Sequence, residues 1–182
     1  MSSHADFLHR KSLAWVAFWE MEKLWRANHL PINLKVNIFK ASVVSVLLYG
    51  CELWVYDASM VDQINSLATS CYMIMLDIRR LDKVPNVDVL ARVNQRELIN
   101  AAYKRQLQWL GQALNRDADE PSRIFALYEP APSHGSARPG RRPTTFYEHI
   151  ASILSPSGMS VNDIVDAAKN EKEWKKKIAV YG

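Results

Sequence analysis

The stretch that decides the fold class is Asn94-Gln-Arg-Glu-Leu-Ile-Asn-Ala-Ala-Tyr-Lys-Arg-Gln-Leu-Gln-Trp-Leu-Gly-Gln-Ala-Leu-Asn115. At 100° per residue, its apolar side chains collect on one broad face, and most of its charged and amide side chains collect on the opposite arc. The apolar face holds Ile99, Ala102, Tyr103, Leu107, Leu110, Ala113 and Leu114, and the polar arc holds Lys104, Arg105, Gln108, Gln112 and Arg116. This period predicts an amphipathic helix, and the pattern Asn94-Gln-Arg-Glu97 predicts a capping box at its start.

Helical patterns continue on both sides of this stretch. The predicted helices cover residues 6–29 and 31–50, and further ones begin at the capping patterns of Ser59, Thr145 and Ser160. The helix from Ser59 is expected to extend to about Ile78, and the last helix covers Lys169–Ile178. Only Leu53–Tyr56 and Ile124–Tyr128 could compete as strands, and the second is equally consistent with a short helix after Pro121. We therefore predict an all-α fold.

The chain divides by composition into three parts. Residues 129–143 contain four of the eight prolines and two of the six glycines, which is typical of a linker or an extended arm. We predict a helical bundle over residues 1–128, an extended Pro/Arg-rich linker over residues 129–143, and a small helical segment over residues 144–182.

Composition excludes several classes of protein. Of the 182 residues, 48% are hydrophobic and 23% are charged, which is far from the composition of a disordered chain. Two cysteines, Cys51 and Cys71, cannot build a four-thiolate zinc site, and their apolar neighbours indicate buried, reduced thiols. The longest apolar run, residues 43–49, is too short to cross a bilayer. We expect an intracellular protein, nuclear or cytoplasmic, with no membrane partner.

The sequence contains no recognisable catalytic motif. Its five histidines lack metal-ligand spacing, its glycines form no phosphate-binding loop, and no nucleophile elbow is present. It also contains no Asp-Asp dipeptide of the kind that holds two metal ions in a polymerase. We expect no enzymatic activity of its own, no catalytic residue, no metal and no cofactor.

Basic and aromatic residues point instead to nucleic acid. The net charge is +4, and 9 basic against 6 acidic residues lie after residue 120, compared with 14 against 13 before it. The candidate nucleic-acid-binding residues are Lys104, Arg105, Trp109 and Arg116 on the central helix, Arg138, Arg141 and Arg142 on the arm, and Lys172, Lys175 and Lys176 near the C-terminus. Guanidinium groups suit bidentate contact with phosphate, and Trp109 or Arg105 could stack on a base or sugar. Each group also has a simpler interpretation: a solvated helix face with Trp109 as half-buried core, a linker made soluble by charge, and a solvated C-terminal surface.

Several motifs in a fixed order carry a resemblance to one family. The segment Leu47-Leu-Tyr-Gly-Cys-Glu-Leu-Trp54, which follows Lys35-Val-Asn-Ile-Phe-Lys40, resembles the Leu-Leu-Tyr-Gly-x-Glu-x-Trp signature of non-LTR (LINE-like) retrotransposon reverse transcriptases. Four later segments keep the family's order: Cys71–Ile78 with Lys83–Asn86, Arg105-Gln-Leu-Gln-Trp-Leu-Gly111 with Asn115-Arg116, Gly140-Arg-Arg-Pro143 with Phe146, and Ala168-Lys-Asn-Glu-Lys-Glu-Trp174-Lys175. The chain departs from the family pattern at Gln112, at Phe146 and at Asn170-Glu171, which replace the usual His, Trp and Asp-Arg.

This resemblance implies the helical thumb of a reverse transcriptase and the region downstream of it. In that family the thumb grips the RNA template and the nascent DNA by their backbones, largely without reading sequence. The resemblance therefore implies RNA or DNA, and an RNA–DNA hybrid in particular, as the partner of a non-catalytic module that lacks the palm and its aspartates. The alternative is a recruited helical scaffold or a protein-interaction subunit of a larger host assembly.

Overall fold

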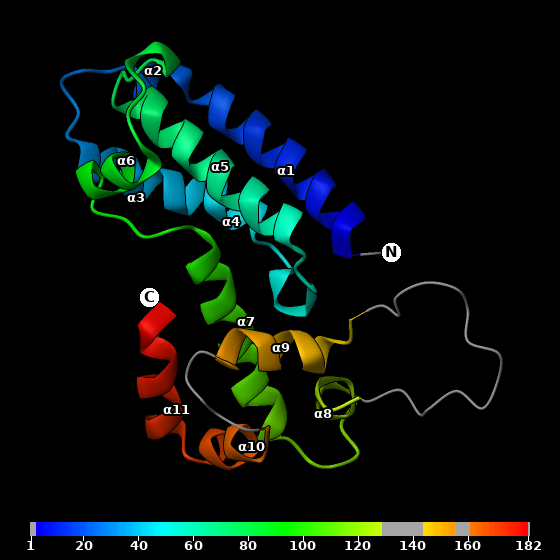
Figure 1. Ribbon diagram of the computed structural model, residues 1–182. Coiled ribbons are helices and arrows are strands. Elements are labelled where there is room, and N and C mark those ends of the chain that lie inside the picture. Colours follow the sequence, from blue (N-terminus) through cyan, green and yellow to red (C-terminus); the bar gives the residue numbers. More distant parts are fainter. Residues whose placement is uncertain (1–2, 129–143, 156–160, 182) are drawn as a thin grey trace. The chain divides into compact units, whose positions relative to one another are not determined.

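The computed structural model describes residues 3–128, 144–155 and 161–181, and every regular element in these ranges is helical (Figure 1). The predicted all-α class is therefore correct for this part of the chain, including Leu53–Tyr56, which contains no strand. Among the same residues, no helix combines the length and the apolarity that crossing a bilayer requires. The predicted linker at residues 129–143 lies outside the described ranges.

The chain forms two compact units. The first consists of residues 1–51 and 56–102, and the second of residues 52–55 and 103–182. The sequence predicts one bundle over residues 1–128, whereas residues from Tyr103 to the end of that range belong with the C-terminal helices. The physical reason is the apolar face of the central helix, where Leu107, Leu110 and Leu114 share a core with residues beyond 144.

From residue 3 on, the first unit contains six complete α-helices and the start of a seventh. They are α1 (Ser3–Glu20), α2 (Glu22–Trp25), α3 (Ile32–Phe39), α4 (Ser45–Leu47), α5 (Ala58–Met75), α6 (Asn86–Arg92) and the beginning of α7 (Ile99–Leu114). The predicted helix over residues 6–29 divides between α1 and α2. The one over residues 31–50 contains a π-helical turn, Lys40–Val44, between α3 and α4. Helix α6 was not predicted.

Two predicted capping boxes are wrong. The cap of helix α5 lies two residues before the predicted cap at Ser59, because the Asp57 carboxylate accepts the Met60 N–H at 2.8 Å. Asn94 does not cap α7, since it takes a left-handed conformation with φ of 51°. The helix begins at Ile99, whose N–H is bonded to Asn65 Oδ1 of α5 at 3.0 Å.

Aromatic rings build the core of the first unit. Phe18 stacks on Trp25 at 5.1 Å between ring centroids, and Phe39 contacts both Phe18 and Tyr72 edge to face. Lys35 is buried beside them, and its Nζ donates to the carbonyl oxygens of Trp25 and Met75 at the ends of α2 and α5. A cation at two helix C-termini is stabilised by the backbone dipoles. Cys51 and Cys71 are both buried, as predicted.

In the part of the second unit that the structure describes, most of α7 is joined by four shorter helices. These are α8 (Pro121–Ala126), α9 (Phe146–Leu154), α10 (Val161–Lys169) and α11 (Glu171–Ile178). The Thr145 capping box is confirmed in full: its hydroxyl accepts the Glu148 N–H, and the Glu148 carboxylate accepts the Thr145 N–H. The cap predicted at Ser160 lies outside the described residues. The predicted last helix is interrupted at Asn170, which separates α10 from α11.

Candidate nucleic-acid interface

A close contact between Gly111 and Trp174 joins α7 to α11. The indole Nε1 of Trp174 donates to the main-chain carbonyl of Leu107 at 2.9 Å. A Cβ atom at position 111 would overlap the same indole, so only glycine allows the ring to lie this close to the helix. Trp174 is buried with Leu107 and Ile178 in the core of the second unit. The Arg105–Gly111 and Ala168–Lys175 segments, both singled out in the sequence, therefore meet at this contact.

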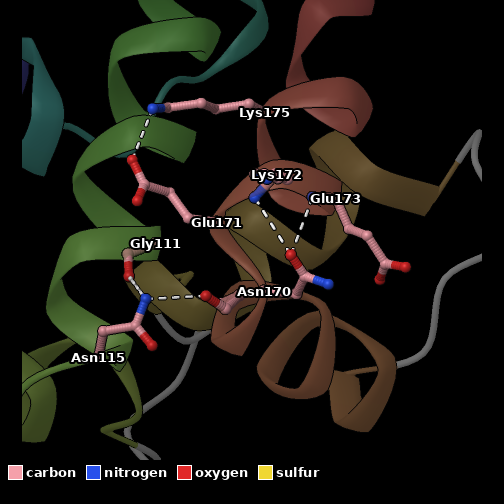
Figure 2. Close-up of polar contacts among 8 residues, drawn as sticks. Gly111, Asn115, Asn170, Glu171, Lys172, Glu173 and Lys175 are labelled. Atoms are coloured by element: carbon pink, nitrogen blue, oxygen red, sulfur yellow. Dashed lines mark hydrogen bonds and ion pairs between the residues drawn. The ribbon is translucent and has the colours of Figure 1, made fainter.

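Asn115 and Asn170 fix the ends of these helices. Asn115 Nδ2 donates to Gly111 O at 2.9 Å and to Ala168 O at 2.8 Å, so one side chain binds the last turns of α7 and α10 (Figure 2). Asn170 Oδ1 accepts the N–H groups of Lys172 and Glu173, which caps the start of α11. Asn170 stands where the family pattern has an acidic residue, and it performs the capping role that an aspartate also performs.

A groove of mixed polar and apolar lining follows the line where α7 and α11 meet. Its volume is about 620 Å³, and it is lined by Gln108, Gly111, Gln112, Asn115 and Arg116 on one side and by Ala168, Glu171, Trp174, Lys175 and Ile178 on the other. Lys175 pairs with Glu171 at 2.5 Å across one turn of α11, and this hydrogen bond lowers the pKa of the Glu171 carboxyl. The groove thus offers three side-chain amides, two cations and one carboxylate, since Glu171 also lines it and pairs with Lys175.

The structure distributes the predicted binding residues unevenly around this groove. Arg116 and Lys175 line it directly from opposite sides. Lys104 precedes Gln108 by one helical turn, and Arg105 lies two turns before Gln112, so both are aligned with groove residues along α7. Lys172 and Lys176 are exposed on α11, one position beyond Glu171 and Lys175. Arg138, Arg141 and Arg142 lie outside the described residues.

Trp109 occupies a different side of α7. Its ring contacts Phe146 edge to face at 5.5 Å and Phe125 at 6.2 Å, and it packs against the core of the second unit. This position matches the half-buried core residue that the sequence allowed as the alternative to a base-stacking platform.

Sequence reasoning missed a buried polar pair on α7 and α9. Gln106 is fully buried, its Nε2 donates to Trp54 O at 2.7 Å, and its Oε1 lies 3.2 Å from His149 Nε2. Because a carbonyl oxygen only accepts, the Gln106 amide is oriented by Trp54 and its oxygen faces the histidine, which must donate from Nε2. Burial lowers the pKa of His149 to about 4. His149 could have been found, since it lies at helical spacing from the apolar residues Phe146, Ile150 and Ile153.

In the described ranges, no group of three or more His, Cys, Asp and Glu side chains is placed to hold a metal ion. The groove provides hydrogen-bonding amides and cations, which suit an extended polyanion.

Comparison with known proteins finds similarity to a nematode protein. The chain is 23% identical over 172 residues to a protein of Caenorhabditis elegans whose name describes it as uncharacterized and of supposed transposon origin. The alignment covers 91% of this chain and 61% of the length of the nematode protein. No protein-family model matches the chain, and no solved structure matches it.

Proposed function

We propose that this chain is a transposon-derived, non-catalytic nucleic-acid-binding module that resembles the thumb and C-terminal part of a non-LTR retrotransposon reverse transcriptase. Its ligand is an RNA or DNA backbone, and an RNA–DNA hybrid in particular. Three facts support the proposal: the ordered motifs, the similarity to a protein named as transposon-derived, and the all-helical fold of the described residues.

The observation that carries the proposal is the Gly111–Trp174 contact. Two of the motif segments are far apart in the sequence, and this contact brings them together. The same contact brings Arg116 and Lys175 to opposite sides of one groove. Motif residues therefore build the groove, and cations at its two sides provide the attraction to phosphate.

The proposal is tested by comparing two charge-matched double variants. Arg116→Ala/Lys175→Ala removes the two cations of the groove. Lys23→Ala/Lys40→Ala removes two exposed cations of the first unit and lowers the net charge by the same amount. Binding to a fluorescently labelled RNA–DNA hybrid is measured by anisotropy over a range of salt concentrations.

We expect the groove variant to bind more weakly and to lower the slope of log K against log salt by about 1.5 to 2, because two phosphate contacts are lost. The control variant should bind nearly as the unmodified chain does. Equal loss in the two variants would mean that only net charge matters and would remove the groove from the proposal.

One observation favours the protein-interaction alternative. Helix α1 exposes Leu8, Val16 and Trp19, whose exposed fractions are 45%, 56% and 46%. Large apolar side chains on one helix are typical of a surface that contacts another protein. A defined partner whose binding survives nuclease treatment and is lost in Val16→Asp/Trp19→Asp would support this second function.

A further inference from the structure

We propose that the groove between α7 and α11 selects an RNA strand by accepting a hydrogen bond from a ribose 2′-hydroxyl at Asn115 Oδ1. The inference rests on the proposed function, because it assumes that the groove binds a nucleic-acid backbone. What is new is that the bound strand is RNA and that Asn115 Oδ1 is the atom that distinguishes RNA from DNA.

The Asn115 amide has only one possible orientation. Both of its N–H groups are donated to main-chain carbonyls, those of Gly111 and Ala168. Rotating the amide by half a turn would place Oδ1 against two carbonyl oxygens, which cannot donate. The position of Oδ1 is therefore set by the ends of α7 and α10 and requires no ligand to establish it.

The fixed oxygen is an acceptor on the groove surface. Asn115 is exposed and lines the groove, and Figure 2 shows its oxygen on the side of the amide away from the two carbonyls. Within the described ranges no N–H or O–H group is bonded to Oδ1. A ligand that fits this atom must therefore bring a hydrogen-bond donor to it.

The two cations of the groove define the rest of the ligand. Arg116 follows Asn115 in the chain, and Lys175, which is paired with Glu171, lies on the opposite side of the groove. A ligand that fits both the Oδ1 acceptor and the two cations carries a hydrogen-bond donor beside a negative charge. An RNA strand has this pattern in every nucleotide, since its 2′-hydroxyl is adjacent to a phosphate, whereas the DNA backbone has phosphates and no donor.

Gln108 and Gln112 extend the same chemistry along α7. Both are exposed and line the groove, and each amide can donate and accept. A 2′-hydroxyl also donates and accepts, so these amides can meet successive hydroxyls, while a phosphate oxygen can use only their donor side. Asn115 differs from them because its orientation is already fixed.

The experiment compares three probes of one sequence by fluorescence anisotropy with the full chain. The first is an RNA–DNA hybrid, the second is the same hybrid with 2′-fluoro RNA, and the third is the DNA duplex. Fluorine keeps the sugar geometry of RNA but cannot donate a hydrogen bond. We expect the unmodified chain to bind the RNA hybrid at least about threefold more tightly than the 2′-fluoro hybrid, the effect of one neutral hydrogen bond.

Two variants test whether the preference for the RNA hybrid over the 2′-fluoro hybrid depends on Asn115. Asn115→Ala should lose most of the difference between the first two probes. Arg116→Ala should weaken both by the same factor and keep their ratio. If circular dichroism shows that Asn115→Ala has lost helix, the comparison of probes with the unmodified chain decides by itself.

The outcomes separate the inference from the function on which it rests. Equal affinity for the RNA and 2′-fluoro hybrids overturns the inference and leaves nucleic-acid binding standing. A preference that persists in a folded Asn115→Ala variant overturns the role of Asn115. No binding to any of the three probes overturns the proposed function itself.

Discussion

The indole N–H of Trp174 is bonded to the main-chain carbonyl of Leu107, 67 positions earlier in the chain, at 2.9 Å. The contact is possible because Gly111, one turn after Leu107, has no side chain to exclude the ring. It explains why a glycine stands in the last turn of α7, although glycine is less favourable within a helix than alanine by about 1 kcal/mol. In this protein Gly111 leaves room for the Trp174 ring, and the ring bonds to the helix that contains Gly111.

Replacing Gly111 with alanine should destabilise the protein. The new methyl group overlaps the Trp174 indole, and overpacking of this kind typically costs about 1–3 kcal/mol, partly offset by the better helix propensity of alanine. The free energy of unfolding, measured by urea denaturation, checks this. In a Trp174→Leu background the same substitution should cost much less, and an equal cost in both backgrounds would show that the indole is not the reason for the glycine.

The stability of the second unit should fall with acid because of His149. Its pKa in the folded chain is about 4, below its ordinary value of 6.5, so the unfolded chain takes up a proton more readily than the folded one. The stabilisation is complete above pH 6.5 and is lost as the pH falls toward 4. Between pH 8 and pH 5 we expect a loss of about 2 kcal/mol from this residue.

The matched variant for this prediction is His149→Gln. Its amide can still donate to Gln106 Oε1 but does not titrate in this range. Unfolding by urea at several pH values should show a shallower dependence between pH 7 and pH 5 in the variant. An unchanged slope would assign the acid sensitivity to other groups.

Removing the cap of α5 should cost more than removing the residue that the sequence suggested as its cap. Asp57→Ala should destabilise the protein by about 1 kcal/mol, because the Met60 N–H loses its acceptor. Ser59→Ala, two positions later, should change the free energy of unfolding by less than about 0.5 kcal/mol. Similar costs for the two substitutions would contradict the assignment of Asp57 as the cap.

The sequence correctly predicts those features that depend only on residues within one helix. The amphipathic face of α7 is confirmed, since Leu107, Leu110 and Leu114 are buried while Gln108 and Gln112 are exposed. The Thr145 box is confirmed because both of its partners lie within one turn. The start of α7 could not be predicted in the same way, since the amide of Ile99 is bonded by Asn65, 34 residues away.

In the candidate site, too, local features could be predicted from the sequence, whereas contacts between distant segments could not. Arg116 and Lys175 could each be chosen from local charge patterns, but no local pattern places them at one groove. Their meeting depends on the Gly111–Trp174 contact, and the orientation of Asn115 depends on the carbonyl of Ala168, 53 residues later. Gln106 gave no signal, because its burial depends on Trp54 and His149 from distant segments.

The arginines of the arm can be tested without reference to the structure. We expect Arg138→Ala/Arg141→Ala/Arg142→Ala to weaken binding of an RNA–DNA hybrid by several-fold or more, because three guanidinium groups that can contact phosphate are removed. Competition anisotropy against the unmodified chain measures the loss. Unchanged binding would show that the arm does not contact the hybrid and would leave the α7–α11 groove as the proposed binding surface.

The most direct test of the central claim is the affinity of the unmodified chain for a labelled RNA–DNA hybrid as the salt concentration is raised. A module that grips a nucleic-acid backbone through several cations should bind at low salt and weaken steeply, with a slope of log K against log salt of about −0.7 to −0.9 for each phosphate contacted. With Arg116, Lys175 and neighbouring cations engaged, the slope should be −2 or steeper (about −0.8 per contact for three or more contacts). Absence of binding at low salt, or an affinity that does not change with salt, would contradict the account.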